Sequence, residues 1–296
     1  MDSYPEPARA LVVAMTAAAA ANPARAVAFQ GAPGAYSHQA VREAFAGYAP
    51  LPCLAFDDAL EAVRSGAAAR AMIPIENSLH GRVADIHFLL PESGLHIVGE
   101  HFVRVRHCLM STGPRDAIVE ALSHPQALGQ CRATLKDAGI RPVAVFDTAG
   151  GAAAVAAARD PALAAVASEL AGELYGLTVH ARGIEDAPHN TTRFVVLAVE
   201  AAAVPSEGPV MTSLNFEVRN VPAALFKALG GFATNGVNIT KLESYLRDGS
   251  FAAAEFYAEI EGAPAEESVA RALDELRYHT KWLRLLGTYA RVRERS

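Results

Sequence analysis

Residues 211–246, MTSLNFEVRNVPAALFKALGGFATNGVNITKLESYL, decide the plan of the C-terminal part of the chain. Apolar and polar side chains alternate over residues 211–218, which predicts a half-buried strand. Apolar residues then recur at helical spacing over 222–236 and stop at a glycine, which predicts a helix. Residues 237–246 return to a strand pattern.

The sequence beyond this stretch completes a pattern of six elements. A strand is predicted in GSFAAAEFYAEIEG after a turn at Asp248–Gly249, followed by a helix in EESVARALDELRYHT and a last strand in LRLLGTYARV. The order β-α-β-β-α-β predicts a ferredoxin-like domain over residues 209–292. The Pro/Gly/Ser-containing stretch AAAVPSEGPV, residues 201–210, is the predicted connector in front of it.

Upstream of the connector, short apolar runs alternate with helical patterns. RAVAFQGAPGAYSHQAVREAF predicts strand, turn and helix, FDDALEAVRSG predicts a helix ended by Gly66, and ARAMIPIENS predicts a strand that ends in polar residues. The alternation continues to about residue 200. It predicts an α/β fold of mostly parallel sheets with helices on both faces.

Composition narrows the classes of partner. The chain has 296 residues and a formal net charge of -6, which argues against nucleic acid and anionic membranes as partners. Cys53, Cys108 and Cys131 are odd in number and scattered, which favours reduced thiols in a cytoplasmic protein over disulfides. No Cys/His spacing is typical of a zinc site, so no metal is expected.

The N-terminal residues 1–24 are rich in alanine. ALVVAMTAAAAANPA resembles the core of a signal peptide, but Asp2 and Glu6 against the single Arg9 are the wrong flank for export. The apolar run is also too short to span a bilayer. We expect an Ala-rich helix or a frayed extension.

Polar side chains gather at the carboxyl ends of several predicted strands, where open α/β sheets bind ligands. Each motif alone has a structural alternative. GAPG can hold an anion or form only a tight turn, His124 can be a core histidine, and the polar residues at the strand ends can cap helices. The candidate ligand-binding residues in these motifs are Ser37, Glu76, Asn77, Ser78, Ser123, Gln126, Gln130 and Thr148.

The stretch HNTTRF, residues 189–194, is harder to explain structurally. Thr192 and Arg193 directly precede the apolar run VVLAV, which predicts a buried strand. A buried arginine needs an anionic partner. Polar strand ends with few carboxylates therefore predict a pocket that binds an anion through hydrogen bonds.

Six motifs in order resemble those of the prephenate dehydratases: GAPGAYSHQA, PIENSLHG, SHPQALGQC, DTAGGAA, YGLTV and NTTRFVVL. The tail resembles the ACT regulatory domain, and the likeness covers roughly residues 26 to 290. It implies a two-lobed catalytic domain, similar to periplasmic binding proteins, over residues 25–202. Lobe 1 would comprise 25–101 and 182–202, lobe 2 would comprise 102–181, and the active site would lie between them.

The resemblance also implies the reaction. Prephenate would lose its ring carboxylate as CO2 and its ring hydroxyl as water, giving phenylpyruvate in phenylalanine biosynthesis without a cofactor. Thr192 would be the catalytic residue, Arg193 would clamp a carboxylate, and Phe194 would pack against the ring or the lobe contact. Asn190 and the strand-end residues above would complete substrate binding. Arogenate in place of prephenate stays open.

For the tail, the resemblance implies a homodimer or homotetramer and an effector, L-phenylalanine. The predicted effector-binding residues are Ala223, Ala224, Leu225, Asn238, Glu243 and Ser244. VPAAL has Ala223 where the family commonly has glycine, and ESYL has Tyr245 and Leu246 where Arg-Pro is usual. Because a methyl group restricts close backbone approach, we expect altered inhibition by phenylalanine.

Two other classes remain as alternatives. A periplasmic-type ligand-binding protein would explain two α/β lobes but not the ferredoxin-like tail. A pure amino-acid sensor would explain the tail but not HNTTRF.

Overall fold

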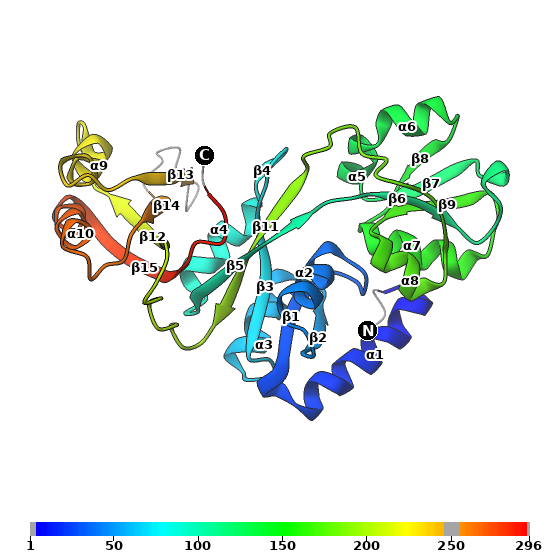
Figure 1. The fold of residues 1–296 in the computed structure, drawn as a ribbon, viewed down its shortest axis with the longest axis horizontal. Coiled ribbons are helices and arrows are strands. Elements are labelled where there is room, and N and C mark those ends of the chain that lie inside the picture. Colours follow the sequence, from blue (N-terminus) through cyan, green and yellow to red (C-terminus); the bar gives the residue numbers. More distant parts are fainter. Residues whose placement is uncertain (1–3, 246–254, 295–296) are drawn as a thin grey trace. The chain divides into compact units, whose positions relative to one another are not determined.

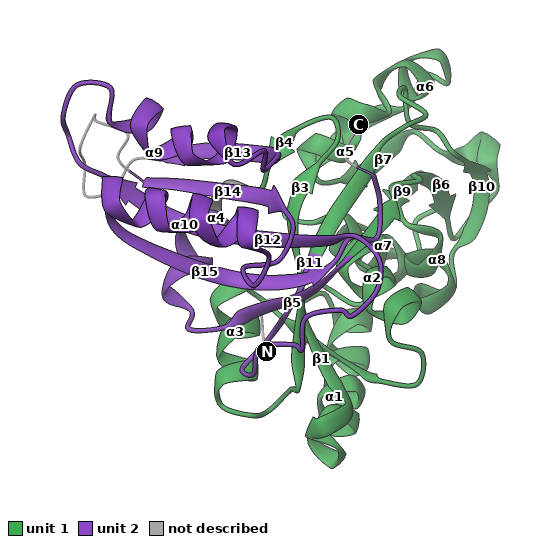
Figure 2. Ribbon diagram, turned by 60° about the vertical axis from the view of Figure 1, so that its left-hand side comes forward, with its two compact units in different colours: residues 1–86, 101–194 green, residues 87–100, 195–296 purple. Residues whose placement is uncertain are grey.

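The computed structural model describes residues 4–245 and 255–294, so Leu246 and the turn predicted at Asp248–Gly249 lie outside the described residues. Figure 1 shows the order of the elements along the chain. The chain divides into two compact units, residues 1–86 with 101–194, and residues 87–100 with 195–296 (Figure 2).

The first sheet is built from strands that flank the predicted polar stretches. Its order is β2-β1-β3-β11-β5, with the short β4 added to β3, and β1 runs parallel to both β2 and β3. The strands are β1 (Ala26–Gln30), β2 (Ala49–Cys53), β3 (Arg70–Asn77), β4 (Gly81–Arg82), β5 (His96–Arg104) and β11 (Thr191–Ala198). The helices between them are α2 (Tyr36–Ala44), α3 (Phe56–Arg64) and α4 (Ala84–Leu89), with 3-10 turns η1 (Pro23–Arg25) and η2 (Leu90–Glu92).

The second sheet has the order β10-β6-β9-β7-β8. Its strands are β6 (Cys108–Ser111), β7 (Glu120–Ser123), β8 (Arg141–Ala144), β9 (Leu163–Ala167) and β10 (Thr178–Arg182). Its helices are η3 (Arg115–Ala117), α5 (Pro125–Gln130), α6 (Arg132–Asp137), α7 (Thr148–Ala158) and α8 (Glu169–Tyr175).

The prediction of mostly parallel sheets is confirmed only in part, because each sheet also contains an antiparallel strand, β4 in the first and β6 in the second. In the second sheet β7 runs parallel to β8 and β9, whereas β6 is antiparallel to β9 and β10. Strand β10 follows β9 through α8 and runs in the same direction as β9, so β6, by which the chain enters this sheet, is the strand that runs opposite to the other four.

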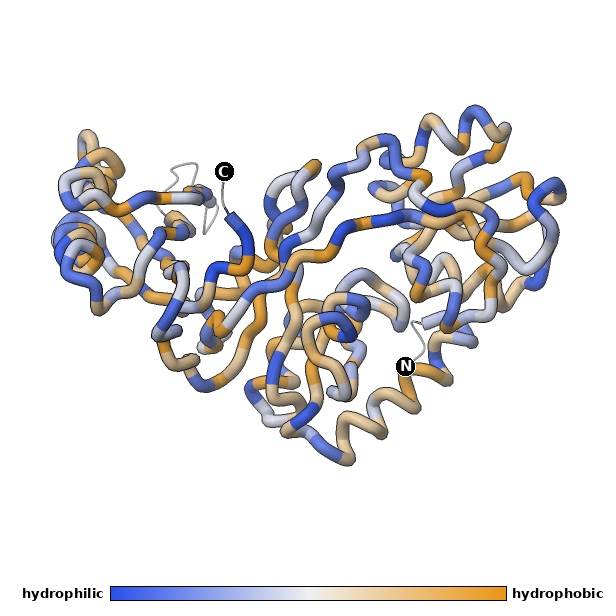
Figure 3. The backbone as a smooth tube through the Cα atoms, viewed as in Figure 1, coloured by the Kyte–Doolittle hydropathy of each residue, from blue (hydrophilic) through white to orange (hydrophobic). Residues whose placement is uncertain are grey.

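The Ala-rich N-terminal stretch forms a helix, α1 (Glu6–Ala21), that packs against β2 and α7. Tyr4, Ala8 and Val12 belong to a buried cluster with residues of α7 and α8. In Figure 3 most of the N-terminal helix has the pale orange colour of moderate hydrophobicity. Within the described residues, no helix is both long and apolar enough to cross a membrane.

The second unit has the predicted order β-α-β-β-α-β. Its elements are β12 (Val210–Val218), α9 (Ala224–Thr234), β13 (Ile239–Tyr245), β14 (Glu255–Glu261), α10 (Glu267–His279) and β15 (Thr280–Ala290). The sheet order is β13-β14-β12-β15, and the recorded pairs are antiparallel. Leu214, Phe216 and Ile260 of the sheet pack with Phe232 and Leu276 of the helices in one core.

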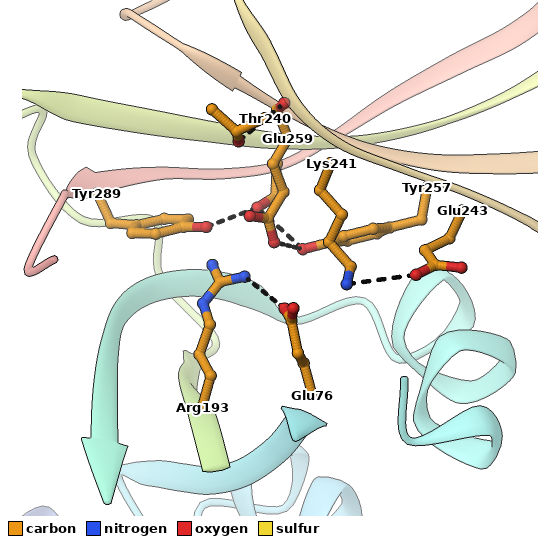
Figure 4. A network of polar contacts seen from close by, with 9 residues as sticks. Glu76, Arg193, Thr240, Lys241, Glu243, Tyr257, Glu259 and Tyr289 are labelled. Atoms are coloured by element: carbon orange, nitrogen blue, oxygen red, sulfur yellow. Dashed lines mark hydrogen bonds and ion pairs between the residues drawn. The ribbon is translucent and has the colours of Figure 1, made fainter. Parts of the chain in front are cut away.

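Alternate residues of the same strands carry polar groups. Tyr257 Oη donates to Glu259 Oε1 at 2.5 Å and lies 3.2 Å from Ser213 Oγ, which is 2.7 Å from Tyr289 Oη (Figure 4). All four residues are buried. The period of two in a strand thus separates an apolar face from a hydrogen-bonded one.

Candidate active site

The first unit contains a cavity of about 370 Å³, within the range of small-molecule sites. Strands of the first sheet line it together with residues that lie next to strands of the second sheet or in the helices that follow them. Of the residues predicted from the sequence, the lining includes Ser37, Asn77, Gln126, Gln130, Thr148, Asn190, Thr192 and Phe194. Segments separated by more than 100 positions in the chain thus meet at one site.

Strand β11 presents its residues alternately to the cavity. Asn190, Thr192 and Phe194 line it, whereas Arg193 does not. The Arg193 guanidinium is buried, with Nη1 3.5 Å from Glu76 Oε2 (Figure 4). Because successive side chains of a strand point to opposite faces, Thr192 and Arg193 cannot both face the same cavity.

Arg193 and Glu76, both predicted to bind substrate, are not among the residues that line the cavity. The anionic partner that a buried arginine requires is a carboxylate of the chain itself. The alternation of side chains within TTRF was the sequence signal that separates Thr192 from Arg193.

Two predicted serines are used by the fold. Ser123 has no exposed surface, and its hydroxyl donates to the Val166 carbonyl at 2.6 Å. Ser78 Oγ donates to the His189 carbonyl at 3.0 Å and accepts from the Thr191 N–H at 2.9 Å, which ties the end of β3 to β11. Neither serine lines the cavity.

The GAPG turn joins the two lobes. The Pro33 carbonyl accepts from Tyr175 Oη at 2.7 Å, and the Gly34 carbonyl accepts from Ser168 Oγ at 2.5 Å. Gly34 has φ +93°, and a Cβ atom there would lie 2.7 Å from Ala171 Cα. Pro33 and Gly34 therefore form a packing contact in which carbonyl groups point at hydroxyls, while Gly31 at the start of the turn lines the cavity.

Asp147 and His124 cap the helices α7 and α5, whereas Ser37 does not cap α2. Asp147 caps α7, accepting from the Gly150 N–H at 2.6 Å; burial raises the pKa of Asp147, and the backbone donors oppose that shift. Ser37 is not a cap, since α2 begins at Tyr36 after Ala35. His124 is not a core histidine: it is half-buried, lines the cavity, and its Nδ1 accepts from the Gln126 N–H at 3.2 Å.

Asn77 is oriented by its own turn rather than by a helix. Its Oδ1 accepts from the backbone N–H groups of Leu79 at 3.0 Å and His80 at 3.2 Å. Its Nδ2 therefore faces β11, where it donates to Asn190 Oδ1 at 2.7 Å and to Thr192 Oγ1 at 3.0 Å. Since Thr192 Oγ1 accepts from this amide, its own proton is available to an acceptor in the cavity.

The chain of contacts continues into the second lobe. Asn190, which is fully buried, donates from Nδ2 to Gln130 Oε1 at 3.0 Å. Gln130 Oε1 also lies 2.8 Å from His107 Nε2, and His107 Nδ1 lies 3.0 Å from Tyr36 Oη. Tyr36 and His107 were not predicted from the sequence. A signal for His107 exists, because this polar residue precedes the apolar strand CLMS as Thr192 precedes VVLAV.

The second unit has a separate pocket of about 500 Å³. Four predicted effector residues line it: Ala223, Ala224, Leu225 and Ser244. Asn238, which donates to Glu261 at 3.2 Å, and Glu243, which pairs with Lys241 at 3.3 Å, are not part of the lining. Ala223 has φ 58°, a left-handed conformation that glycine adopts more readily.

The first unit thus has two mixed sheets with helices, and its cavity is lined by amides, hydroxyls and histidines. This arrangement is typical of two-lobed enzymes that act on a small polar molecule. The family model for prephenate dehydratase matches residues 27–202. The chain belongs to the prephenate dehydratase family.

Individual relatives agree with this assignment. The chain is 50% identical over 272 residues to the bifunctional N-acyl-homoserine lactone acylase/prephenate dehydratase of Komagataeibacter europaeus, covering 90% of this chain and 96% of that protein. It is 41% identical to arogenate dehydratase/prephenate dehydratase 2 of Arabidopsis thaliana, a chloroplastic protein, covering 89% and 72%. The crystal structure of prephenate dehydratase from Arthrobacter aurescens in complex with L-Phe superposes with a TM-score of 0.81 at 30% identity, covering 90% of each chain.

Proposed function

We propose that this chain converts prephenate to phenylpyruvate, CO2 and water in L-phenylalanine biosynthesis. The observation that carries the proposal is the Thr192 hydroxyl, which lines the cavity and accepts from Asn77, so that its proton can be donated to a ligand. Membership of the prephenate dehydratase family supports the same reaction.

The chemistry demands little covalent help from the protein. The bond from the ring to its carboxylate breaks, its electrons become a ring double bond, and the ring C–O bond breaks opposite it. The leaving oxygen takes up a proton and departs as water, while aromatisation supplies the driving force. A donor fixed at that oxygen acts where negative charge develops, which is the role we assign to Thr192.

The remaining lining residues bind the dianion in this proposal. Ser37, Gln126 and Thr148 offer donors on the cavity wall, and Arg82 supplies a guanidinium to that wall. Phe194, which is almost fully buried, borders the cavity and offers an apolar surface to the ring.

Replacing Thr192 tests the mechanism. Thr192→Ala removes the donor, and we expect kcat to fall by about 10²–10⁴-fold, the usual worth of acid assistance. Thr192→Ser keeps the hydroxyl and should keep most of the activity. Phenylpyruvate formed from prephenate is measured by its absorbance in alkali, with melting temperatures as the folding control. Near-normal turnover by Thr192→Ala would contradict the assignment.

Arogenate is the alternative substrate of the same site. It differs from prephenate by an amine in place of a keto oxygen, and the Arabidopsis relative carries both activities in its name. The ratio of kcat/KM for the two substrates decides between them, and we expect prephenate to be preferred.

We also propose that the second unit is an ACT domain that controls the activity by binding an amino acid. The pocket lined by Ala223, Ala224, Leu225 and Ser244 supports this role. The Arthrobacter aurescens structure was solved in complex with L-Phe, which makes L-phenylalanine the first effector to examine. A cytoplasmic homodimer or homotetramer completes the proposal.

A second candidate activity comes from the Komagataeibacter europaeus relative, whose name includes N-acyl-homoserine lactone acylase. Its 50% identity over 96% of its length favours examining that activity in this chain. The reaction would add water across the amide bond and release homoserine lactone. Incubation with an N-acyl-homoserine lactone, followed by detection of the freed amine, tests it independently of the prephenate assay.

A further inference from the structure

One line of hydrogen bonds runs from Thr192 through the side chains of Asn77, Asn190, Gln130 and His107 to Tyr36. The residues come from five separate places in the sequence, since only Asn190 and Thr192 are near neighbours. Each amide in the line has a donor end and an acceptor end, so the orientation of one amide decides that of the next.

The orientation is anchored at the turn after β3. Backbone N–H groups can only donate, and those of Leu79 and His80 both point at Asn77. The atom that they meet must be Oδ1, and the atom of Asn77 that meets Asn190 must be Nδ2. The same reasoning makes Asn190 accept from Asn77 and donate to Gln130 Oε1.

The orientation then specifies the tautomer of His107. Gln130 Oε1 can only accept, so His107 Nε2 must carry a proton. Burial lowers the pKa of His107, which favours the neutral ring and leaves Nδ1 without a proton, 3.0 Å from Tyr36 Oη. Burial also raises the pKa of Tyr36 well above its usual range, so its hydroxyl keeps its proton, which His107 Nδ1 shares with the Arg106 carbonyl 2.8 Å away.

Both ring nitrogens of His107 are therefore engaged by the protein. Although His107 borders the cavity, neither nitrogen is left to exchange a proton with a ligand. Without the Nε2–H donor, the Gln130 amide could turn over. Asn190 would then lose its acceptor, and the pair formed by Asn77 and Thr192 would lose its support.

We propose that His107, which donates from Nε2 to Gln130 Oε1, is a positioning residue that keeps Gln130, Asn190 and Asn77 oriented so that the Thr192 proton faces the substrate. The proposal rests on the proposed dehydratase function. It predicts an effect on kcat rather than on the affinity for substrate, since His107 acts through other residues.

Three variants test the proposal with prephenate as substrate. His107→Leu removes the donor, and we expect kcat to fall about tenfold, the effect of roughly one buried hydrogen bond, with KM changed less than about threefold. His107→Gln places an amide N–H near the position of Nε2 and should recover most of kcat. The kcat of Tyr36→Phe should lie between that of His107→Leu and that of the unchanged chain.

His180→Leu is the matched control. His180 is also a partly buried histidine of the second lobe, with Nε2 2.8 Å from Ser111 Oγ, and it does not line the cavity. The kcat of His180→Leu should stay within about twofold of that of the unchanged chain. Melting temperatures of all variants separate loss of fold from loss of positioning.

A second readout does not depend on activity. Nitrogen-15 NMR of the histidine rings should show His107 protonated at Nε2, and Tyr36→Phe should shift the ring toward a mixture of tautomers.

Three results would each overturn the proposal. They are a His107 ring protonated at Nδ1, an equal loss of kcat in His107→Gln and His107→Leu, and an unchanged kcat in folded His107→Leu. Loss of one limb of the pH profile in His107→Leu would instead make His107 a direct proton donor. A wild-type chain inactive on prephenate would contradict the proposed function and leave the NMR result to decide the tautomer.

Discussion

At the scale of single residues, position within a strand matters as much as residue type. Thr192 and Arg193 are neighbours in one motif, yet Thr192 lines the cavity while Arg193 pairs with Glu76 away from it. Hydroxyls show the same division. Thr192 faces the cavity, whereas Ser123 donates to a carbonyl of β9 in the interior. A polar residue at a strand end is therefore a candidate ligand residue only if its face of the sheet is open.

Ala223 offers a test of backbone strain at this scale. Its φ of 58° costs an L-residue about 1–2 kcal/mol, and the extra freedom of glycine in the unfolded chain offsets about 0.5–1 of that. We expect Ala223→Gly to raise stability by about 0.5–1 kcal/mol in thermal or urea denaturation. Ala224→Gly, one residue later inside α9, is the control and should lower stability. A destabilised Ala223→Gly would show that the methyl group packs favourably.

At the scale of elements, α1 is an addition that the first unit has incorporated. It lies outside residues 27–202, which match the family model, yet it packs against both β2 of the first lobe and α7 of the second. Ala8 and Val12 are buried in the cluster that also contains Ala149 and Ala152 of α7. The helix thus connects the two lobes that form the cavity.

Two substitutions on α1 separate this packing from helix propensity. Ala8 has no exposed surface, so Ala8→Asp buries an unpaired carboxylate at a cost of about 3–5 kcal/mol. Ala10 is exposed on the same helix, and Ala10→Asp should cost only about 0.5–0.7 kcal/mol. We expect a large fall in melting temperature for Ala8→Asp alone. Equal melting temperatures for the two variants would mean that α1 does not stabilise the first unit.

At the scale of the whole molecule, each unit has its own ligand-sized pocket. The first unit contains the cavity around Thr192, and the second has the pocket around Ala223 and Ser244. This division is compatible with the proposal that the first unit is catalytic and the second regulatory. For an effector bound to the second unit to control activity in the first, it must bind two states of the chain with different affinity.

A thermal-shift screen of amino acids tests the regulatory proposal. A ligand that binds only the folded state raises stability by RT ln(1 + [L]/Kd). Because the Ala223 methyl group restricts backbone approach to a ligand, we expect L-phenylalanine to raise the melting temperature less in the unchanged chain than in Ala223→Gly. Strong, selective stabilisation of the unchanged chain by L-phenylalanine would contradict the expectation of weakened binding.

The sequence by itself determined the order of elements and the family, and it singled out eight of the residues that line the cavity. Hydrophobic periodicity is local, so the β-α-β-β-α-β tail and the polar ends of strands followed from neighbouring residues alone, whereas a helix was only one of two expectations for the N-terminal stretch. The turn that orients Asn77 is equally local, since its donors are two and three residues away.

Only the tertiary structure decided which of these polar groups act together. Strand direction depends on how the chain enters a sheet, so the mixed sheets could not follow from alternation of elements. Hydrogen bonds act over about 3 Å, and the partners Asn77 and Thr192, or His107 and Gln130, meet only once the strands are paired and the lobes packed. The face to which Arg193 points, and the line of amides behind Thr192, were therefore properties of the folded chain.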